Sequence, residues 1–217
     1  MAESSTDSPE QRLERQAERH REIEHRVKNT LQLISSIVLL QGRRATDDGA
    51  RQALKAVQQR VAAVSVSHRH VGWNEDGERV ELAALVREIV GDLAGSAGRE
   101  GVAIDLDLES VTIAGRQGAP VALLVAETVG NALRHAFPGD RSGRIRVTLR
   151  RVSDTFELGI SDDGIGMAEG MQAAGFGLNV VQLMTQQLRG KLSIDPTQPG
   201  LRLSVTVPMD VQASARG

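Results

Sequence analysis

The segment from about Glu10 to Arg43 constrains the fold most strongly, because it is long and almost free of helix breakers. Apolar residues recur in it at spacings of three and four, at Ile23, Val27, Leu31 or Thr30, Ile34, and Val38 or Ile37. This period places them on one face of an α-helix. The sequence GRRATDDG, at 42–49, interrupts the pattern, and Thr46 or Asp47 is suited to cap a following helix.

The segment after this interruption carries a second apolar stripe with helical spacing, formed by Leu54, Val57, Val61, Val64 and His68. Two long helices with a short connection predict an antiparallel hairpin. A hairpin on its own leaves an apolar face in water, and a second copy of the chain can cover that face. We therefore expect a homodimer in which two hairpins form a four-helix bundle.

The composition is that of a soluble protein and argues against several functional classes. Of the 217 residues, 40% are hydrophobic and 25% are charged. A net charge of -2 and an aromatic content of 2% argue against nucleic-acid binding. Cysteine is absent, which excludes disulfides and thiolate metal sites. Because no apolar run is long enough for a bilayer and the N-terminal sequence lacks a signal core, we expect a cytoplasmic protein with no membrane partner.

The sequence GWNEDGER, at 72–79, has the composition of a linker, and the pattern beyond it changes to mixed helix and strand. The patterns predict helices at 80–95, 119–137 and 175–190, and strands at 102–109, 144–152, 155–163, 191–195 and 202–208. The predicted fold class is α+β, with an α/β sandwich of mixed sheet and three helices on one face after the hairpin. The predicted organisation is a disordered tail at 1–8, a hairpin at 9–72, a linker at 73–79, the sandwich domain at 80–208 and a tail at 209–217.

The first motif with chemical meaning lies in ETVGNALRHAF, at 127–137. Glu127 and Asn131 are four residues apart and therefore share a helical face. A carboxylate and an amide oxygen placed in this way can hold a hydrated Mg²⁺ against phosphates. Arg134 and His135 follow one turn further along. Polar pairs at this spacing are also common on solvated helices, so the motif is not specific by itself.

Two glycine motifs follow in the chain. In SDDGIGM, at 161–167, the Asp162 carboxylate can accept a hydrogen bond from an exocyclic amine, and Gly164 and Gly166 allow the backbone to approach a flat ring. In GFGL, at 175–178, Gly175 and Gly177 precede a predicted helix, whose free N–H groups and dipole favour phosphate. Each motif alone also occurs in ordinary turns.

The order of these motifs is specific, although each one alone is not. A helix with E-x-x-x-N, a strand hairpin, D-x-G-x-G and a G-x-G that opens a helix together resemble the ATP-binding domain shared by histidine kinases, gyrase, Hsp90 and MutL. The resemblance implies that ATP and Mg²⁺ are the cofactors and that Glu127 and Asn131 lie at the Mg²⁺. It also implies that Asp162 reads the adenine amine, with Gly164 and Gly166 beside the nucleotide.

The same resemblance assigns the remaining residues of the predicted nucleotide site. Residues 167–174 correspond to a short ATP lid, and Gly175 and Gly177 correspond to phosphate contacts. Arg134 and His135 match positions near the nucleotide phosphates in the kinase branch of the family.

The N-terminal helix carries a second resemblance. HRVKNTLQLISSIVLLQ, at 25–41, is similar to the H-R-x-x-N phosphoacceptor helix of the second-class HisKA histidine kinases, which are related to the HWE group. In that family the histidine, here His25, takes the γ-phosphoryl group of ATP and passes it to an aspartate of a response-regulator receiver domain. Asn29, one turn later, would position a water molecule that hydrolyses the regulator's acyl phosphate. Together the two resemblances cover roughly residues 10–208.

This sequence departs from the family pattern in three places. The W-x-E tripeptide of the HWE branch is absent, which favours the sibling H-R-x-x-N class. No sensor domain precedes the hairpin, so we expect either a separate sensor protein or a downstream phosphotransfer role. Arg26 follows His25 where many histidine kinases have an acidic residue that orients the histidine, which leaves Glu22 and Glu24 as candidates for that role.

The function expected from the sequence is that of a sensor-less histidine kinase in two-component signalling. One alternative with the same architecture is a histidine phosphotransferase or a response-regulator phosphatase with little kinase activity. A second alternative is a non-enzymatic dimeric module that sequesters a regulator. A third is a serine kinase of the anti-sigma type, which shares the ATP fold but needs no H-R-x-x-N helix.

Overall fold

The computed structural model describes residues 9–74, 77–166, 176–197 and 199–209, with the backbone alone described at 9–21, 23–25, 73–74 and 77. The chain divides into two compact units, Met1–Val61 and Ala62–Gly217. The predicted tail at 1–8, the predicted tail at 209–217 apart from Met209, and the predicted lid at 167–174 lie outside the described residues. Within the part of the chain that is described, no helix combines the length and apolar character needed to cross a membrane.

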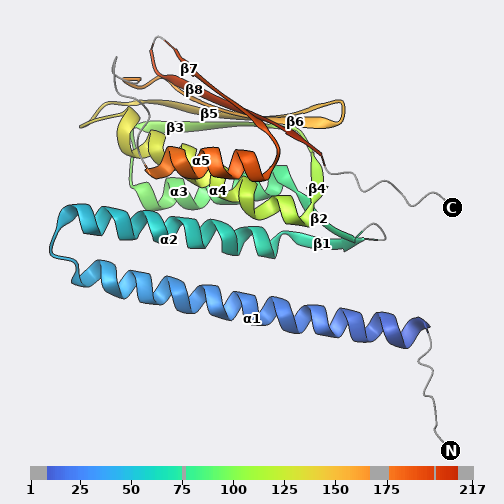
Figure 1. Ribbon diagram of the computed structural model, residues 1–217. Coiled ribbons are helices and arrows are strands. Elements are labelled where there is room, and N and C mark those ends of the chain that lie inside the picture. The colour runs from blue at the N-terminus through green and yellow to red at the C-terminus, as the bar shows by residue number, and fades with distance from the viewer. Residues whose placement is uncertain (1–8, 75–76, 167–175, 198, 210–217) are drawn as a thin grey trace, which may run out of the picture. The chain divides into compact units, whose positions relative to one another are not determined.

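The N-terminal unit is a helical hairpin, as predicted (Figure 1). Helix α1 spans Pro9–Arg44, and helix α2 begins at Asp48 and ends at Arg69 in the second unit. Of the two predicted caps, Asp47 makes the capping bond, because its Oδ1 accepts from the backbone N–H of Ala50 at 2.7 Å. Several apolar side chains of the hairpin remain exposed, namely Leu33, Ile34, Ile37, Leu39, Leu40 and Val57.

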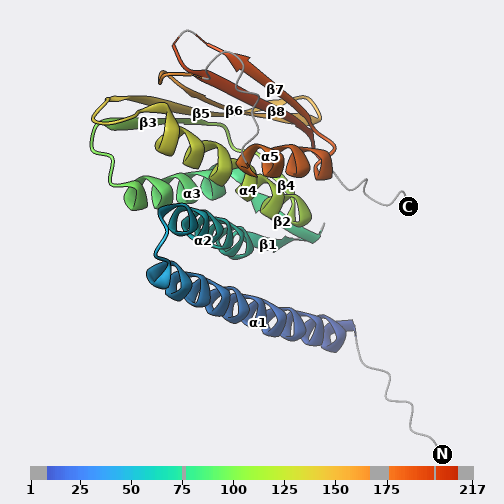
Figure 2. The ribbon, with the colours of Figure 1, turned by 60° about the vertical axis from the view of Figure 1, so that its left-hand side comes forward.

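The C-terminal unit combines helices and sheets as an α+β fold. Its elements are β1 (Val71–Asn74), β2 (Gly77–Glu81), α3 (Leu82–Ala97), β3 (Val102–Leu108), β4 (Thr112–Ala114), α4 (Gly115–Asn131), the π-helical segment η1 (Ala132–Ala136), β5 (Gly143–Val152), β6 (Thr155–Asp162), α5 (Phe176–Gln187), β7 (Lys191–Pro196) and β8 (Leu201–Pro208). Among the described residues the strands form one sheet of order β3-β5-β6-β8-β7 and a smaller one of order β1-β2-β4. The larger sheet is mixed, because β3 and β5 are parallel and its other pairs are antiparallel. Helices α3, α4 and α5 cover one of its faces (Figures 1 and 2).

The main core lies between these helices and the larger sheet. Alternate residues of β5, namely Ile145, Val147 and Leu149, are fully buried, which is the two-residue period of a sheet with one covered face. The aromatic rings of Phe137 and Phe156 are also fully buried. The predicted mixed sheet with helices on one face is therefore confirmed.

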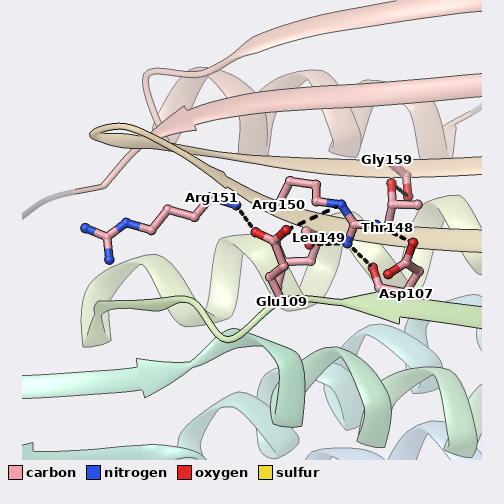
Figure 3. Close-up of polar contacts among 7 residues, drawn as sticks. All are labelled: Asp107, Glu109, Thr148, Leu149, Arg150, Arg151 and Gly159. Carbon is pink, nitrogen blue, oxygen red and sulfur yellow. Dashed lines mark hydrogen bonds and ion pairs between the residues drawn. The ribbon is translucent and has the colours of Figure 1, made fainter.

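The uncovered face and the edge of the sheet are polar, and charged residues tie β3 to β5 (Figure 3). Arg150 of β5 pairs with the carboxylate of Asp107 on β3, and its Nε lies 3.6 Å from Glu109. The backbone N–H of Arg151 donates to Glu109 at 2.9 Å. These contacts add to the ladder with β5 and to the packing of Val102, Ile104 and Leu108 against the core, which also hold β3.

The stretch 72–79 is the main correction to the predicted elements. Strands β1 and β2 occupy most of it, with the register Val71↔Val80, and β2 continues the ladder to β4 with Arg79↔Ala114. Its composition is that of a linker, but β1 and β2 pair with each other as a hairpin, and β2 also pairs with β4 more than thirty residues downstream. The last turns of α2 also belong to the second unit, since Ala63 is buried in its core.

Candidate functional site

Helix α4 presents the predicted E-x-x-x-N pair toward the start of α5. Glu127 is only 3% exposed, and Asn131, one turn later, is half-buried. A Cβ built on Gly177, in the first turn of α5, would lie 2.7 Å from Oε2 of Glu127 and 3.0 Å from Nδ2 of Asn131. A Cβ is not normally found so close to these atoms, so a side chain at 177 would force the two side chains or the start of α5 to shift. The structure therefore brings the helix motif and the second glycine motif together.

The helix changes its hydrogen-bond register immediately after Asn131. The backbone N–H of Ala132 bonds to the carbonyls of both Thr128 and Val129, and residues Ala132–Ala136 form a π-helical segment. Such segments are rare and occur frequently at functional sites. This segment carries both of the predicted phosphate-side residues, Arg134 and His135.

Arg134 folds back over the end of α4. Its Nη2 donates a hydrogen bond to the side-chain oxygen of Asn131 at 2.8 Å. Gly130 leaves room for the guanidinium, because a Cβ there would lie 3.0 Å from Nη1. His135 is exposed beside it, and partial desolvation, together with the positive charge of Arg134, lowers the pKa of its imidazole. This end of the site is electropositive, as a phosphate-binding region requires.

Asp162 ends strand β6 and is half-buried. Burial is the main cause that raises the pKa of its carboxyl, and the neighbouring Asp163 raises it further. Hydrogen bonds from backbone N–H groups act in the opposite direction, and one of them comes from Gly164 at 3.0 Å. A half-buried acceptor in this position suits a neutral donor such as an exocyclic amine.

The glycine loop after Asp162 is fastened to the end of η1. The N–H of Ile165 donates to the carbonyl of Ala136 at 2.9 Å, and a Cβ at Gly164 would overlap that same carbonyl. Gly166 has a φ of +69°, in the left-handed region that favours glycine. The D-x-G-x-G loop and the helix that carries Asn131 are therefore parts of one rigid assembly.

The segment predicted to carry the phosphoacceptor histidine lies in the other unit. His25 and Asn29 are in α1 one turn apart, and the Asn29 side chain is exposed, whereas the His25 side chain lies outside the described part. Of the candidate orienting residues, Glu22 accepts a hydrogen bond from Arg26 at 2.6 Å, so its carboxylate is already engaged. The side chain of Glu24 is not among the described ones.

The sequence motifs did not predict every feature of the candidate site. Gly175 lies outside the described residues, so its predicted phosphate contact stays a prediction. The bond between Arg134 and Asn131 and the role of Gly130 beneath it were not expected. Gly130, four residues before Arg134 and directly before Asn131, is the sequence signal that points to a folded-back guanidinium.

Comparison with known proteins places both units in one family. Residues 22–97 match the HisKA_2 family model, described as a histidine kinase, and residues 117–211 match the model described as histidine kinase-, DNA gyrase B-, and HSP90-like ATPase. A solved structure of the histidine kinase domain from the Erythrobacter litoralis EL346 blue-light activated histidine kinase has a TM-score of 0.69. The match covers 88% of this chain and 93% of that one at 24% identity, which supports the fold.

Curated relatives agree with the two family models. Sensor histidine kinase PdtaS of Mycobacterium tuberculosis is 28% identical over 198 residues, which cover 87% of this chain and 39% of the relative. Blue-light-activated histidine kinase 2 of Erythrobacter litoralis is 24% identical, with 88% of this chain and 57% of the relative covered. The chain thus spans about two fifths to three fifths of the length of these relatives. It belongs to the histidine kinase family, with a HisKA_2 domain followed by an ATP-binding domain of the histidine kinase, gyrase and HSP90 type.

Proposed function

We propose that this chain phosphorylates its own His25 from ATP and passes the phosphoryl group to an aspartate in a response-regulator receiver domain. The observation that carries the proposal is the close approach of Gly177 to both Glu127 and Asn131, within a chain whose HisKA_2 match includes His25. This packing brings the metal-side pair against the helix start that would receive phosphate. The arrangement has the chemistry that phosphoryl transfer requires, namely positioning and charge neutralisation.

The nucleotide would lie across the three elements that meet at this site. Asp162 would accept a hydrogen bond from the adenine amine, and the N-terminal N–H groups of α5 would face the phosphates. Arg134, on η1, supplies a positive charge on the same side. The interlocked loop and helix hold these groups in place before the nucleotide arrives, which reduces the cost of ordering them on binding.

A Mg²⁺ ion fits the donor set at the end of α4. The Glu127 carboxylate and the Asn131 amide oxygen are hard oxygen ligands on one helical face, and Mg²⁺ typically uses one or two protein oxygens together with substrate phosphates and water. When bound, the ion would offset the negative charge of the phosphates. Glu127 is almost fully buried, so its position is set by packing and a neighbouring water or cation would be held in a defined place.

The acceptor is the imidazole of His25. A neutral imidazole carries one ring nitrogen with a free lone pair, and such a nitrogen is a good nucleophile. This nitrogen would attack the γ-phosphorus in line, a nitrogen–phosphorus bond would form, and the bond to the bridging oxygen would break to release ADP. In the second step a receiver-domain carboxylate oxygen would attack the phosphorus. The nitrogen–phosphorus bond would break and leave His25 unmodified.

The exposed apolar face of the hairpin supports a homodimer. Leu33, Ile37 and Leu40 are spaced as one helical face, and their exposed fractions are 62%, 50% and 55%. A groove of about 520 Å³ between α1 and α2 is lined in part by Val38 and Leu54. Burial of such a face is a strong driving force, and a second hairpin would convert the pair into a four-helix bundle.

A phosphatase activity toward the regulator is a second candidate function. Asn29 is exposed one turn after His25, where its amide could hold a water molecule against an acyl phosphate docked at the histidine. Loss of dephosphorylation in Asn29→Ala, with autophosphorylation retained, would support it. Equal dephosphorylation by the wild type and Asn29→Ala would exclude it.

The kinase proposal is tested by incubation with γ-labelled ATP. We expect acid-labile label on the wild type and none on His25→Ala or Asn131→Ala. Matched controls are His68→Ala and Gln187→Ala, which remove an exposed histidine and an exposed amide from α2 and α5 and should keep the label. A wild type that neither binds nucleotide nor takes up label would overturn the proposal.

A further inference from the structure

We propose that Arg134 is a positioning residue that competes with Mg²⁺ for the side-chain oxygen of Asn131. Its guanidinium is hydrogen-bonded to that oxygen until nucleotide binds. This competition sets the Mg²⁺ concentration that nucleotide binding requires. The inference rests on the proposed nucleotide and Mg²⁺ site. It concerns the one oxygen that both the guanidinium and the proposed ion would use.

The geometry gives Arg134 a defined resting position. Nη2 lies 2.8 Å from Oδ1 of Asn131, and Asn131 and Arg134 are both half-buried. A Cβ at Gly130 would lie 3.0 Å from Nη1 and 3.4 Å from Nη2, so the guanidinium lies directly over the glycine backbone. Long side chains on helices fold toward the preceding turn, and here that turn offers both space and an acceptor. The bond therefore orients the Asn131 amide with its oxygen toward Arg134.

The surrounding backbone holds Arg134 in this place. The π-helical segment that carries it begins directly after Asn131 and ends at Ala136. The Ala136 carbonyl accepts from the Ile165 N–H at 2.9 Å, which fastens the segment to the loop after Asp162. Release of Asn131 therefore requires only a change of the Arg134 side-chain conformation, with this backbone contact kept.

Charge makes the two occupants of Asn131 mutually exclusive. A guanidinium and a divalent cation within about 5 Å of each other repel strongly at the edge of a protein. The positive charge of Arg134 is already felt locally, since it adds to the desolvation that lowers the pKa of His135. Arg134 must therefore leave Asn131 before a cation can bind there. Phosphate oxygens are its natural alternative partner, because they accept two parallel hydrogen bonds from a guanidinium.

This reasoning distinguishes Arg134 from a simple phosphate contact. If Arg134 only contacted phosphate, a lysine would preserve the charge and leave the Mg²⁺ requirement unchanged. If Arg134 also blocks Asn131, a lysine would release the amide oxygen, because an ammonium group lacks the planar fork and is more strongly hydrated. The Mg²⁺ concentration at half-maximal nucleotide binding is therefore the informative quantity.

The experiment measures equilibrium binding of ATP to the full chain by calorimetric titration at a series of Mg²⁺ concentrations. For Arg134→Lys we expect the half-saturating Mg²⁺ concentration to fall about tenfold, since a charge-assisted hydrogen bond no longer competes for the oxygen. Gly130→Ala should shift it in the same direction, because the new Cβ displaces the guanidinium without removing its charge. The control Arg202→Lys, exposed on strand β8, should leave it unchanged.

The outcomes separate this inference from the proposed function. Nucleotide binding with the same half-saturating Mg²⁺ concentration in the wild type, Arg134→Lys and Gly130→Ala would overturn the role of Arg134 alone. A wild type that binds no ATP at any Mg²⁺ concentration would overturn the proposed function and this inference with it. A fall in both variants, with the control unchanged, would establish Arg134 as the residue that withholds Asn131 from the cation.

Discussion

Substitution of Gly177 by alanine should damage nucleotide binding far more than it damages the fold. The new Cβ would lie 2.7 Å from Oε2 of Glu127, 3.0 Å from Nδ2 of Asn131 and 3.3 Å from its Oδ1. An ordinary carbon contact is about 3.5 Å, so the closest approach is too short by about 0.8 Å. Glu127 is 3% exposed and cannot move aside freely, so the start of α5 must shift instead.

The expected magnitudes follow from this clash. Overpacking costs about 1–3 kcal/mol, while alanine in place of glycine in a helix returns up to about 1 kcal/mol, so the net loss of unfolding free energy should be about 0–2 kcal/mol. Because a shift of the helix start displaces the N–H groups that would face the phosphates, ATP affinity should fall by at least about tenfold, which corresponds to about 1.4 kcal/mol.

Urea denaturation and calorimetric titration with ATP measure the two effects separately. The matched control is Gly95→Ala on α3, where a Cβ would meet nothing within 4 Å. It should raise the unfolding free energy by about 0.5–1 kcal/mol and leave ATP affinity unchanged. ATP binding by Gly177→Ala at the wild-type affinity would refute the inferred position of the nucleotide against α4 and α5.

Three further predictions concern the contacts of Glu88 on α3 with the end of α2, the proposed dimer and the proposed adenine contact. Glu88 accepts from Arg69 at 2.5 Å and lies 2.6 Å from His70, and the hydrogen bond from Arg69, followed by that from His70, lowers the pKa of Glu88. Its contribution to stability is therefore complete above about pH 4.5 and is lost as the pH falls through the lowered value. Glu88→Gln should thus cost about 0.5 kcal/mol in denaturation at pH 7 and progressively less as the pH falls below 4.5. A cost that does not change with pH would contradict this. Ile37→Asp should convert the dimer to a monomer in light scattering without loss of helical circular dichroism, and an unchanged mass would contradict the bundle. Because burial raises the pKa of Asp162, its carboxylate becomes protonated at a higher pH than that of an ordinary aspartate. ATP binding should therefore begin to weaken at that higher pH as the pH falls, and Asp162→Asn should abolish this pH dependence.

The elements that could be predicted from the sequence are those with strong local periodicity. The apolar stripe of α1 and the alternation in β5 and β6 arise within single segments, so spacing alone reveals them. The small sheet was missed because its residues around Gly72 and Gly77 have turn composition, and because β2 pairs not only with β1 but also with β4, far along the chain. Local composition contains no information about a partner strand so far along the chain.

Some features of the candidate site could be predicted from the sequence, and others could not. The positions of Glu127, Asn131 and Gly177 in their motifs indicated that they belong together, and their packing in the structure agrees. The π-helical segment and the bond between Arg134 and Asn131 were not predicted, because a one-residue change of helical register leaves no periodic trace in five residues.

The most direct measurement of the central claim is to locate the phosphoryl group after incubation of the wild type with ATP. Peptide mass spectrometry under alkaline conditions, which preserve phosphohistidine, identifies the modified residue. The account predicts a single phosphoryl group on His25, absent when Asn131 is replaced by alanine. A phosphoryl group on serine or threonine, or an unmodified His25 in a protein that binds ATP and Mg²⁺, would contradict it.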